Sequence, residues 1–168
     1  ARLLTGIQNR MPVKSGIVEA AKLVSHGVYV ITTNHNARVN GMTAAWVGRA
    51  SFEPPLVTVA IGKTRFSHDM IRDSGIFAVN VLGPDSIPTG KHFGLVSGKK
   101  TDKFTGIEFD VKATGAPILK DALAWLDCKV VSRHDAGDHT LFIGEVLEGG
   151  VLRHGVKPLI YDKESFFK

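Results

Sequence analysis

Short β-rich runs separated by turn signals recur along almost the whole chain, and they constrain the fold more than any other feature. Strands are expected over residues 28–33, 39–52, 56–61, 76–82, 122–133 and 139–147, with a short strand over 159–161. Polar or glycine-containing turns separate neighbouring runs at residues 34–38 and 135–138. The alternating strand–helix order of a doubly wound sheet is absent, so the pattern predicts a mainly β, closed or partly closed antiparallel barrel.

A few helices are expected around this barrel. The apolar spacing predicts one over residues 15–24 and another over residues 67–73. Ser67 is placed to cap the second helix and Gly75 to end it, and a short helical turn is expected after Pro88. These helices would cover the open ends of the barrel.

Composition indicates one globular unit. The chain has no internal repeat or linker, so we expect a single domain over residues 1–168. No apolar run approaches the ~20 residues that a membrane span requires, and residues 1–14 lack the apolar core of a secretory signal. The only cysteine, Cys128, lies in an apolar run and is expected to be buried and inert. A reducing cytoplasm is the expected location.

The net charge of +5 raises the question of an anionic partner. The basic residues are scattered, with one dense cluster at Lys99, Lys100 and Lys103. The sequence has no aromatic-interleaved RNA motif, zinc-finger spacing or long basic helix, so no nucleic acid partner is expected. A ligand that carries a phosphate explains a local cluster better.

The segment at residues 40–46 has unusual contents for a barrel strand. Gly41, Ala44 and Ala45 stand where such a strand normally carries valine or isoleucine. Small side chains allow a flat ligand to approach the backbone closely. They are equally compatible with a bulged strand whose small residues face a neighbouring helix. The spacing alone leaves both interpretations open.

Three further clusters are candidates for chemistry. Residues 63–68 combine hydroxyls, a guanidinium and a helix start, which together hold phosphate without a metal; simple capping by Ser67 is the alternative. Residues 93–104 form a glycine-containing loop in which Lys103 offers a positive charge and Phe104 an anchor; an exposed, solvated loop is the alternative.

The third cluster is residues 134–139, where His134 and His139 flank a turn that contains two aspartates. A zinc or iron site must be considered, but the spacing supplies no third ligand. Asp138 could instead orient the His139 imidazole at the rim of a ligand pocket, or these residues could be ordinary turn and surface residues. No metal is expected.

In order, these motifs resemble the flavin reductase-like family of FMN-binding split-barrel proteins, in its short flavin reductase and flavoredoxin type. The resemblance covers residues 16–162 and is carried by residues 40–43, 51–55, 64–68, 76–82, 93–94, 97–98, 102–104 and 137–139. It implies a six-stranded antiparallel Greek-key split β-barrel that works as a homodimer. It implies FMN, rather than FAD, near the subunit interface.

The resemblance also implies roles for individual residues. The isoalloxazine ring would lie along Asn40, Gly41, Met42, Thr43, Ala44 and Ala45, with Ser51 and Phe52 bordering the same pocket. Thr64, Arg65 and Ser67 would hold the FMN phosphate, and Lys103 would reach it from the later loop. His139 would sit close to the ring as the catalytic residue, where NADH or NADPH donates electrons.

The implied function is a flavin reductase that passes hydride from nicotinamide to flavin and on to an acceptor. The alternative is an electron-transfer protein that keeps FMN bound and exchanges electrons with a protein partner. A third hypothesis, a barrel that binds nucleic acid or another anion, rests only on the basic pI of about 9.4 and the lysine cluster.

Overall fold

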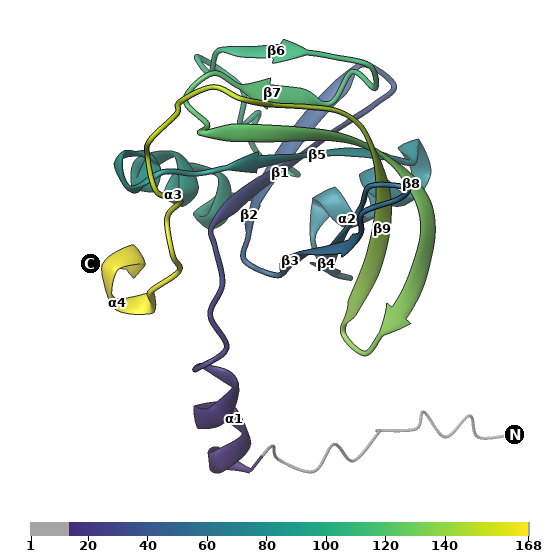
Figure 1. The fold of residues 1–168 in the computed structure, drawn as a ribbon. Coiled ribbons are helices and arrows are strands. Elements are labelled where there is room, and N and C mark those ends of the chain that lie inside the picture. Colours follow the sequence, from purple (N-terminus) through teal and green to yellow (C-terminus); the bar gives the residue numbers. More distant parts are fainter. Residues whose placement is uncertain (1–13, 168) are drawn as a thin grey trace, which may run out of the picture.

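The computed structural model describes residues 14–167, and strands dominate it (Figure 1). Its elements, in chain order, are α1 Ser15–Ala21, β1 Tyr29–His35, β2 Arg38–Ala44, β3 Val47–Ser51, β4 Leu56–Gly62, α2 Phe66–Ser74, β5 Ile76–Val81, η1 Pro84–Ser86, α3 Ile87–Leu95, β6 Phe109–Val111, β7 Pro117–Leu119, β8 Ala124–Ala136, β9 His139–Val151 and α4 Lys163–Phe167. No helix of this part of the chain is long and apolar enough to cross a bilayer.

The main sheet is antiparallel and rolls into a split barrel. Its strands lie in the order β2-β1-β5-β8-β9-β4-β3. The two strands at the ends of this order, β2 and β3, are joined in the chain by Ala45 and Trp46 alone. The sheet must therefore curl until its two edges come close to each other. The Ala60 N–H of β4 donates to the Trp46 carbonyl over 3.0 Å, which extends the β3–β4 pairing into this connection. The predicted mainly β antiparallel barrel is confirmed.

The strand count differs from the expected six. In the described part of the chain the main sheet has seven strands, and β6 and β7 form a separate hairpin. The extra strand arises because the run predicted over residues 39–52 is divided at Ala45 and Trp46 into β2 and β3. The chain crosses from one edge of the sheet to the other at that point, so one continuous β-rich run serves two distant strands.

Two apolar clusters fill the fold. The first lies inside the barrel, where β4 alternates buried and half-buried residues and directs Val57, Val59 and Ile61 inward against Phe77 and Phe142. The second lies between the sheet and the segments that cover its end, and it contains Val28, Leu82, Phe93, Phe104, Leu119 and Phe166. Because the second cluster includes residues of α3 and of the loop that follows it, it fixes both against β2.

The helices match the prediction in part. Gly75 ends α2 in the left-handed conformation, with φ of 71°, as expected. Capping by Ser67 is wrong: α2 begins at Phe66, Arg65 is its N-cap, and no side chain makes a capping hydrogen bond. Ser67 lies inside the helix, which frees its hydroxyl for another partner. The helix α1 ends at Ala21, three residues before the predicted end.

Candidate functional site

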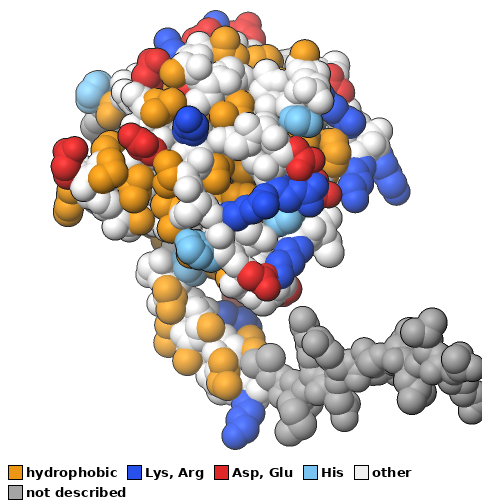
Figure 2. Space-filling view, turned by 90° about the vertical axis from the view of Figure 1, so that its right-hand side faces the viewer, with side chains coloured by type: hydrophobic (Ala, Val, Ile, Leu, Met, Phe, Trp, Pro, Cys, Tyr) orange, Lys and Arg blue, Asp and Glu red, His pale blue; other side chains and the backbone are white. Residues whose placement is uncertain are grey.

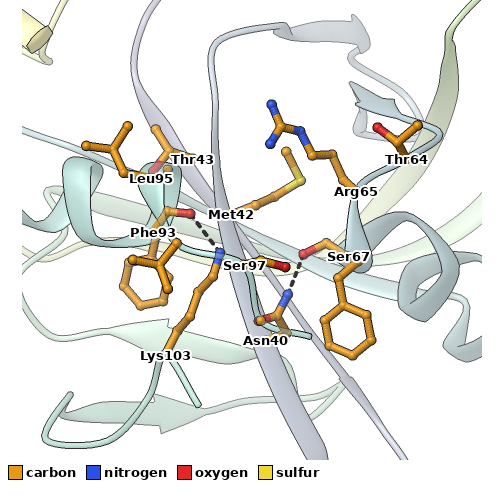
Figure 3. Close-up of a pocket in the computed structure, with 14 residues that line it drawn as sticks. Asn40, Met42, Thr43, Thr64, Arg65, Ser67, Phe93, Leu95, Ser97 and Lys103 are labelled. Atoms are coloured by element: carbon orange, nitrogen blue, oxygen red, sulfur yellow. Dashed lines mark hydrogen bonds between the residues drawn. The ribbon is translucent and has the colours of Figure 1, made fainter. Parts of the chain in front are cut away.

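A cavity of about 240 Å³ lies between β2, the start of α2 and the loop after α3 (Figure 3). We call it the anion cavity. It is lined by Asn40, Met42, Thr43, Thr64, Arg65, Phe66, Ser67, Phe93, Gly94, Leu95, Val96, Ser97, Gly98 and Lys103. The fold thus brings together three segments that are far apart in the sequence and that the motif analysis had selected separately. None of the lining residues is acidic.

Ser67 is held in place by the neighbouring strand. The Asn40 side-chain amide donates to Ser67 Oγ over 2.8 Å, and both side chains are buried (Figure 3). The Ser67 oxygen therefore acts as an acceptor, and its own proton has no recorded acceptor among residues 14–167. A buried hydroxyl proton without a partner is costly. The first turn of α2 adds backbone N–H groups at the same place.

Lys103 is a buried cation in the wall of the anion cavity. Only 4% of the residue is exposed, and its Nζ donates to the carbonyls of Gly41 and Phe93, each over 2.9 Å. One of its three N–H groups remains for a ligand. Burial, with the charge of Arg65 as the second cause, lowers the pKa of the Lys103 ammonium to about 8.

The loop that carries Lys103 is anchored from within. The Phe104 ring is buried and packs against Phe93, with 5.3 Å between the ring centroids, so of the two alternatives left open by the sequence Phe104 follows the anchored one. The Phe104 N–H donates to Asp102 Oδ1 over 2.9 Å. The loop is therefore fixed at its base, and the alternative of a wholly solvated loop does not apply to Lys103. Lys99 and Lys100 do remain exposed.

A second depression, which we call the small-residue groove, continues from the anion cavity along the end of β2. One part has about 170 Å³ and is lined by Met42, Thr43, Ala44, Ala45, Trp46, Ala60, Gly62, Arg65 and His139. Another part has about 330 Å³ and is lined by Val28, Thr43, Ala44, Ala45, Trp46, Arg65, Gly94, Leu95, Tyr161 and Phe166. Both parts share the walls Thr43 and Arg65 with the anion cavity, so the three spaces adjoin.

Of the three small residues in and just after β2, one packs against a neighbouring helix and two line open space, so each of the two interpretations holds for some of them. A Cβ on Gly41 would lie 3.0 Å from the Phe93 ring, so Gly41 faces α3 and allows the helix to approach. Ala44 and Ala45 instead line open space. Thr43 is fixed between the two groups because its hydroxyl donates to the Gly90 carbonyl over 2.5 Å. The groove is therefore shallow at Ala44 and Ala45 and closed at Gly41.

His139 lies at the far end of the small-residue groove. Its Nδ1 lies 2.7 Å from Asp138 Oδ1, and its ring centroid is 4.7 Å from that of Trp46. The sequence analysis missed Trp46, which is 52% exposed and lines both parts of the groove. Its position directly after Ala44 and Ala45 was the only available signal. Trp46 limits the orientations that the His139 ring can adopt.

The structure does not bring the other histidine of that turn to the same place. His134 pairs with Leu141, whereas His139 pairs with Ala136. Asp135 forms an ion pair with Lys63. Within residues 14–167 no group of three His, Cys, Asp or Glu side chains is close enough to hold a metal ion.

Ser51 and Phe52 lie away from the site in this chain. Ser51 ends β3, after a register shift that begins at Arg49, and neither Ser51 nor Phe52 lines the anion cavity or the groove. Phe52 is 81% exposed and packs beneath the Arg49 guanidinium at 4.4 Å.

Cys128 is buried as expected, and burial, followed by the charge of Asp127, raises the pKa of its thiol to about 12.

The fold and the site define a class of protein: a split β-barrel with an acid-free anion cavity beside a shallow groove. The chain belongs to the flavin reductase-like family of FMN-binding split-barrel proteins, because the model of the flavin reductase like domain matches residues 21–168. The family predicted from the ordered motifs is thereby confirmed.

Three similar proteins illustrate the range of this family. The high molecular weight rubredoxin of Moorella thermoacetica is 34% identical over 146 residues, which are 85% of this chain and 63% of that protein. The ferric-chelate reductase (NAD(P)H) of Archaeoglobus fulgidus is 33% identical over 138 residues, 81% of this chain and 82% of the relative. The structure of the NADH:FAD oxidoreductase SgcE6 of Streptomyces globisporus has a TM-score of 0.81 at 27% identity and covers 87% of this chain and 86% of its own. This chain therefore spans less than two thirds of the rubredoxin.

Proposed function

We propose that this protein binds FMN and acts as an NAD(P)H-dependent flavin reductase. The observation that carries the proposal is the continuity of the site: an acid-free cavity with two cations adjoins a groove lined by alanines, and the groove ends at a histidine. FMN has the matching parts, namely a phosphate, a flat ring system and one ring face that a second substrate must reach.

The residues present fit FMN on three grounds. Lys103 has one N–H group that neither carbonyl accepts, and within residues 14–167 the buried Ser67 hydroxyl is seen only as the acceptor of the Asn40 amide, so its proton is available to a ligand. Arg65 adds a second positive charge, which lowers the pKa of Lys103 and is not balanced by any acid of the cavity. A phosphate would satisfy all three groups at once. The ring would then lie along Thr43, Ala44 and Ala45.

Bound there, FMN would supply the redox chemistry by accepting hydride from nicotinamide. The chain's own residues provide the binding and the access. The phosphate would be held by Thr64, Arg65, Ser67 and Lys103. The small side chains that line the groove leave room for the flat ring. His139, oriented by Asp138 and Trp46, stands where the nicotinamide would enter and donates or accepts a hydrogen bond through Nε2.

The visible spectrum of the purified protein, followed by addition of NADH or NADPH, tests this function. We expect a yellow protein, or one that becomes yellow with FMN, whose flavin absorbance bleaches and recovers catalytically in air. A protein that takes up no flavin, or one that turns over with neither nucleotide, would contradict the proposal.

The second candidate is an electron carrier with tightly bound FMN. The similarity to a rubredoxin-named relative supports it, and the net charge of +5 suits an acidic protein partner. A yellow protein that a reduced partner protein reduces, but that neither nicotinamide nucleotide reduces, would select this candidate.

The helix α1 supports a homodimer as the working form. It projects away from the barrel, and none of its residues is buried in this chain (Figures 1 and 2). Ile17 and Val18 in the helix, and Leu23 and Val24 just after it, are exposed although they are apolar. A second copy would cover this face, as the amphipathic pattern requires. A mass in solution near 18.1 kDa, that of one chain, would contradict the dimer.

Replacing His139 by Asn is expected to slow reduction of the bound flavin by NAD(P)H about tenfold and to leave FMN affinity near its original value. Asparagine is polar but lacks the Nε2 atom and the ring that packs against Trp46. The nicotinamide therefore loses one hydrogen bond and one packing surface. Anaerobic stopped-flow reduction measures the rate. His134→Asn is the matched control because His134 lies outside the groove; an unchanged rate in His139→Asn would make His139 a structural residue.

A further inference from the structure

One wall of the anion cavity, the loop of residues 95–102, is attached to the rest of the protein at a single buried point. Within this loop only Gly98 is buried, and its neighbours on both sides are exposed. The backbone N–H groups of residues 99–101 donate to Ser97, so these hydrogen bonds stay inside the loop. In the described part of the chain, the one recorded hydrogen bond from a distant segment to this loop comes from Arg38. The position of the wall therefore depends on what holds Gly98.

Gly98 packs closely against the two other walls of the anion cavity. A Cβ at residue 98 would overlap Asn40 Oδ1 and would lie 3.0 Å from the Phe66 ring. The space is too small for a side chain, so the glycine backbone itself closes the cavity between the loop and α2. The Asn40 amide in turn donates to Ser67 Oγ (Figure 3). A displacement of Gly98 would therefore also disturb the hydroxyl that we assign to the phosphate.

Arg38 joins the loop to α2 from outside the cavity. Its Nη2 donates to the Gly98 carbonyl over 2.9 Å, and its Cζ lies 4.5 Å above the centroid of the Phe66 ring. Gly98 and Phe66 line the anion cavity, whereas Arg38 does not. A planar guanidinium stacks on a ring with its face while it donates from its edge, a geometry that the compact lysine ammonium does not reproduce. One side chain of β2 thus holds the two other walls together.

These two contacts are the recorded interactions of the Arg38 side chain. No ion pair of Arg38 is recorded within residues 14–167. The residue is exposed at the start of β2, so it fills no space in either apolar cluster. Replacing Arg38 should therefore leave the fold intact and release only the loop.

We propose that Arg38 is a positioning residue of the phosphate site, which holds the loop against α2 through Gly98 and Phe66 and thereby slows the release of FMN. Arg38 does not touch the phosphate. It keeps Gly98, and through it Asn40 and Ser67, in the places where the phosphate would meet them. This inference rests on the proposed flavin function and names a residue that decides how firmly the protein retains its flavin between turnovers.

The test compares Arg38→Gln and Arg38→Lys with the original protein. Fluorescence titration gives the Kd of FMN and of riboflavin, and stopped-flow fluorescence gives the rate of FMN dissociation. In Arg38→Gln we expect FMN to dissociate about tenfold faster and its Kd to rise by the same factor, with riboflavin affinity within about twofold. Arg38→Lys should agree with Arg38→Gln to within about twofold, because the charge alone does not hold the loop.

Arg49→Gln is the matched control. Arg49 is also an exposed arginine stacked on a phenylalanine, with 4.4 Å from its Cζ to the Phe52 ring centroid, but it lines neither the anion cavity nor the small-residue groove. This variant should leave the affinities and the dissociation rate unchanged. Amide hydrogen exchange without flavin adds a readout that does not depend on binding: residues 97–102 should exchange faster in both Arg38 variants and not in Arg49→Gln.

Each other outcome overturns the inference in a recognisable way. Original FMN affinity in Arg38→Lys would show that Arg38 acts by its charge alone. Unchanged hydrogen exchange in the loop would show that Arg38 does not hold it. Equal losses of FMN and riboflavin, or a similar loss of FMN in Arg49→Gln, would show an effect that is not specific to the phosphate site. If the original protein binds neither flavin, the proposed function itself is wrong; if it binds both and Arg38→Gln changes nothing, only the role of Arg38 is wrong.

Discussion

Replacing Arg65 by Ala is expected to weaken FMN binding about 30-fold, or about 2 kcal/mol, and to leave riboflavin affinity within about threefold. Only FMN carries the phosphate, and once Arg65 is replaced Lys103 is the one lysine or arginine left among the residues that line the anion cavity. The stability of the helix α2 should not change, because the side chain of its N-cap residue, Arg65, makes no capping hydrogen bond. Fluorescence titration with both ligands measures the two affinities.

Ser67→Ala and Lys63→Ala sharpen this experiment. Ser67→Ala removes the hydroxyl that is held by Asn40 and should also weaken FMN more than riboflavin. Lys63 is a neighbouring cation that pairs with Asp135 and does not line the anion cavity, so Lys63→Ala should change neither affinity. Equal losses of FMN and riboflavin in Arg65→Ala would place Arg65 on the ring rather than on the phosphate.

Part of the lining of the anion cavity could be predicted from the sequence, because several of its residues are close together in the chain. Thr64, Arg65 and Ser67 share one short segment at a helix start, and Lys103 stands in a glycine-containing loop. The role of Ser67 was partly misjudged because the sequence cannot show that Asn40 approaches it from another strand. Neighbouring residues thus predicted part of the cavity lining, whereas the side chains that orient these residues depend on the tertiary fold.

The small-residue groove was harder to predict, because its lining depends on how the sheet closes into a barrel. Gly41, Ala44 and Ala45 look alike in the sequence, yet Gly41 faces Phe93 and the alanines face open space. Trp46 meets His139 only because the chain changes edges of the sheet between β2 and β3. No local pattern signals that change, and for the same reason one β-rich run was predicted where the structure has two strands.

The first helix, α1, shows that the sequence predicts an apolar face but not the partner that covers it. The apolar spacing of residues 15–24 predicts an amphipathic helix, because a 3.6-residue period places these side chains on one face, and the structure has a helix over the first part of this range, Ser15–Ala21. The period does not specify what covers that face. In the described chain nothing does, so the pattern that elsewhere predicts a core position here predicts contact with a second molecule.

Replacing Lys103 by Met is expected to weaken FMN binding about 100-fold at pH 7 and to abolish its pH dependence. In the original protein the pKa of the Lys103 ammonium is about 8 without ligand, because the group is buried and near Arg65. A bound phosphate favours the charged form and raises that pKa. FMN affinity should therefore be constant between about pH 7 and the free pKa, and fall by up to about tenfold per pH unit above it.

Titrations of FMN and riboflavin from pH 7 to 9 measure this dependence. Below that range the phosphate itself gains a proton, with a second pKa of about 6. Riboflavin affinity should stay flat in both proteins, because riboflavin has no group that meets the ammonium. Lys103→Arg is the matched variant: it keeps the charge at every pH in this range and should remove the fall above pH 8 while retaining more affinity than Lys103→Met. A fall that persists in Lys103→Met would assign the titration to another group and would remove Lys103 from the phosphate site.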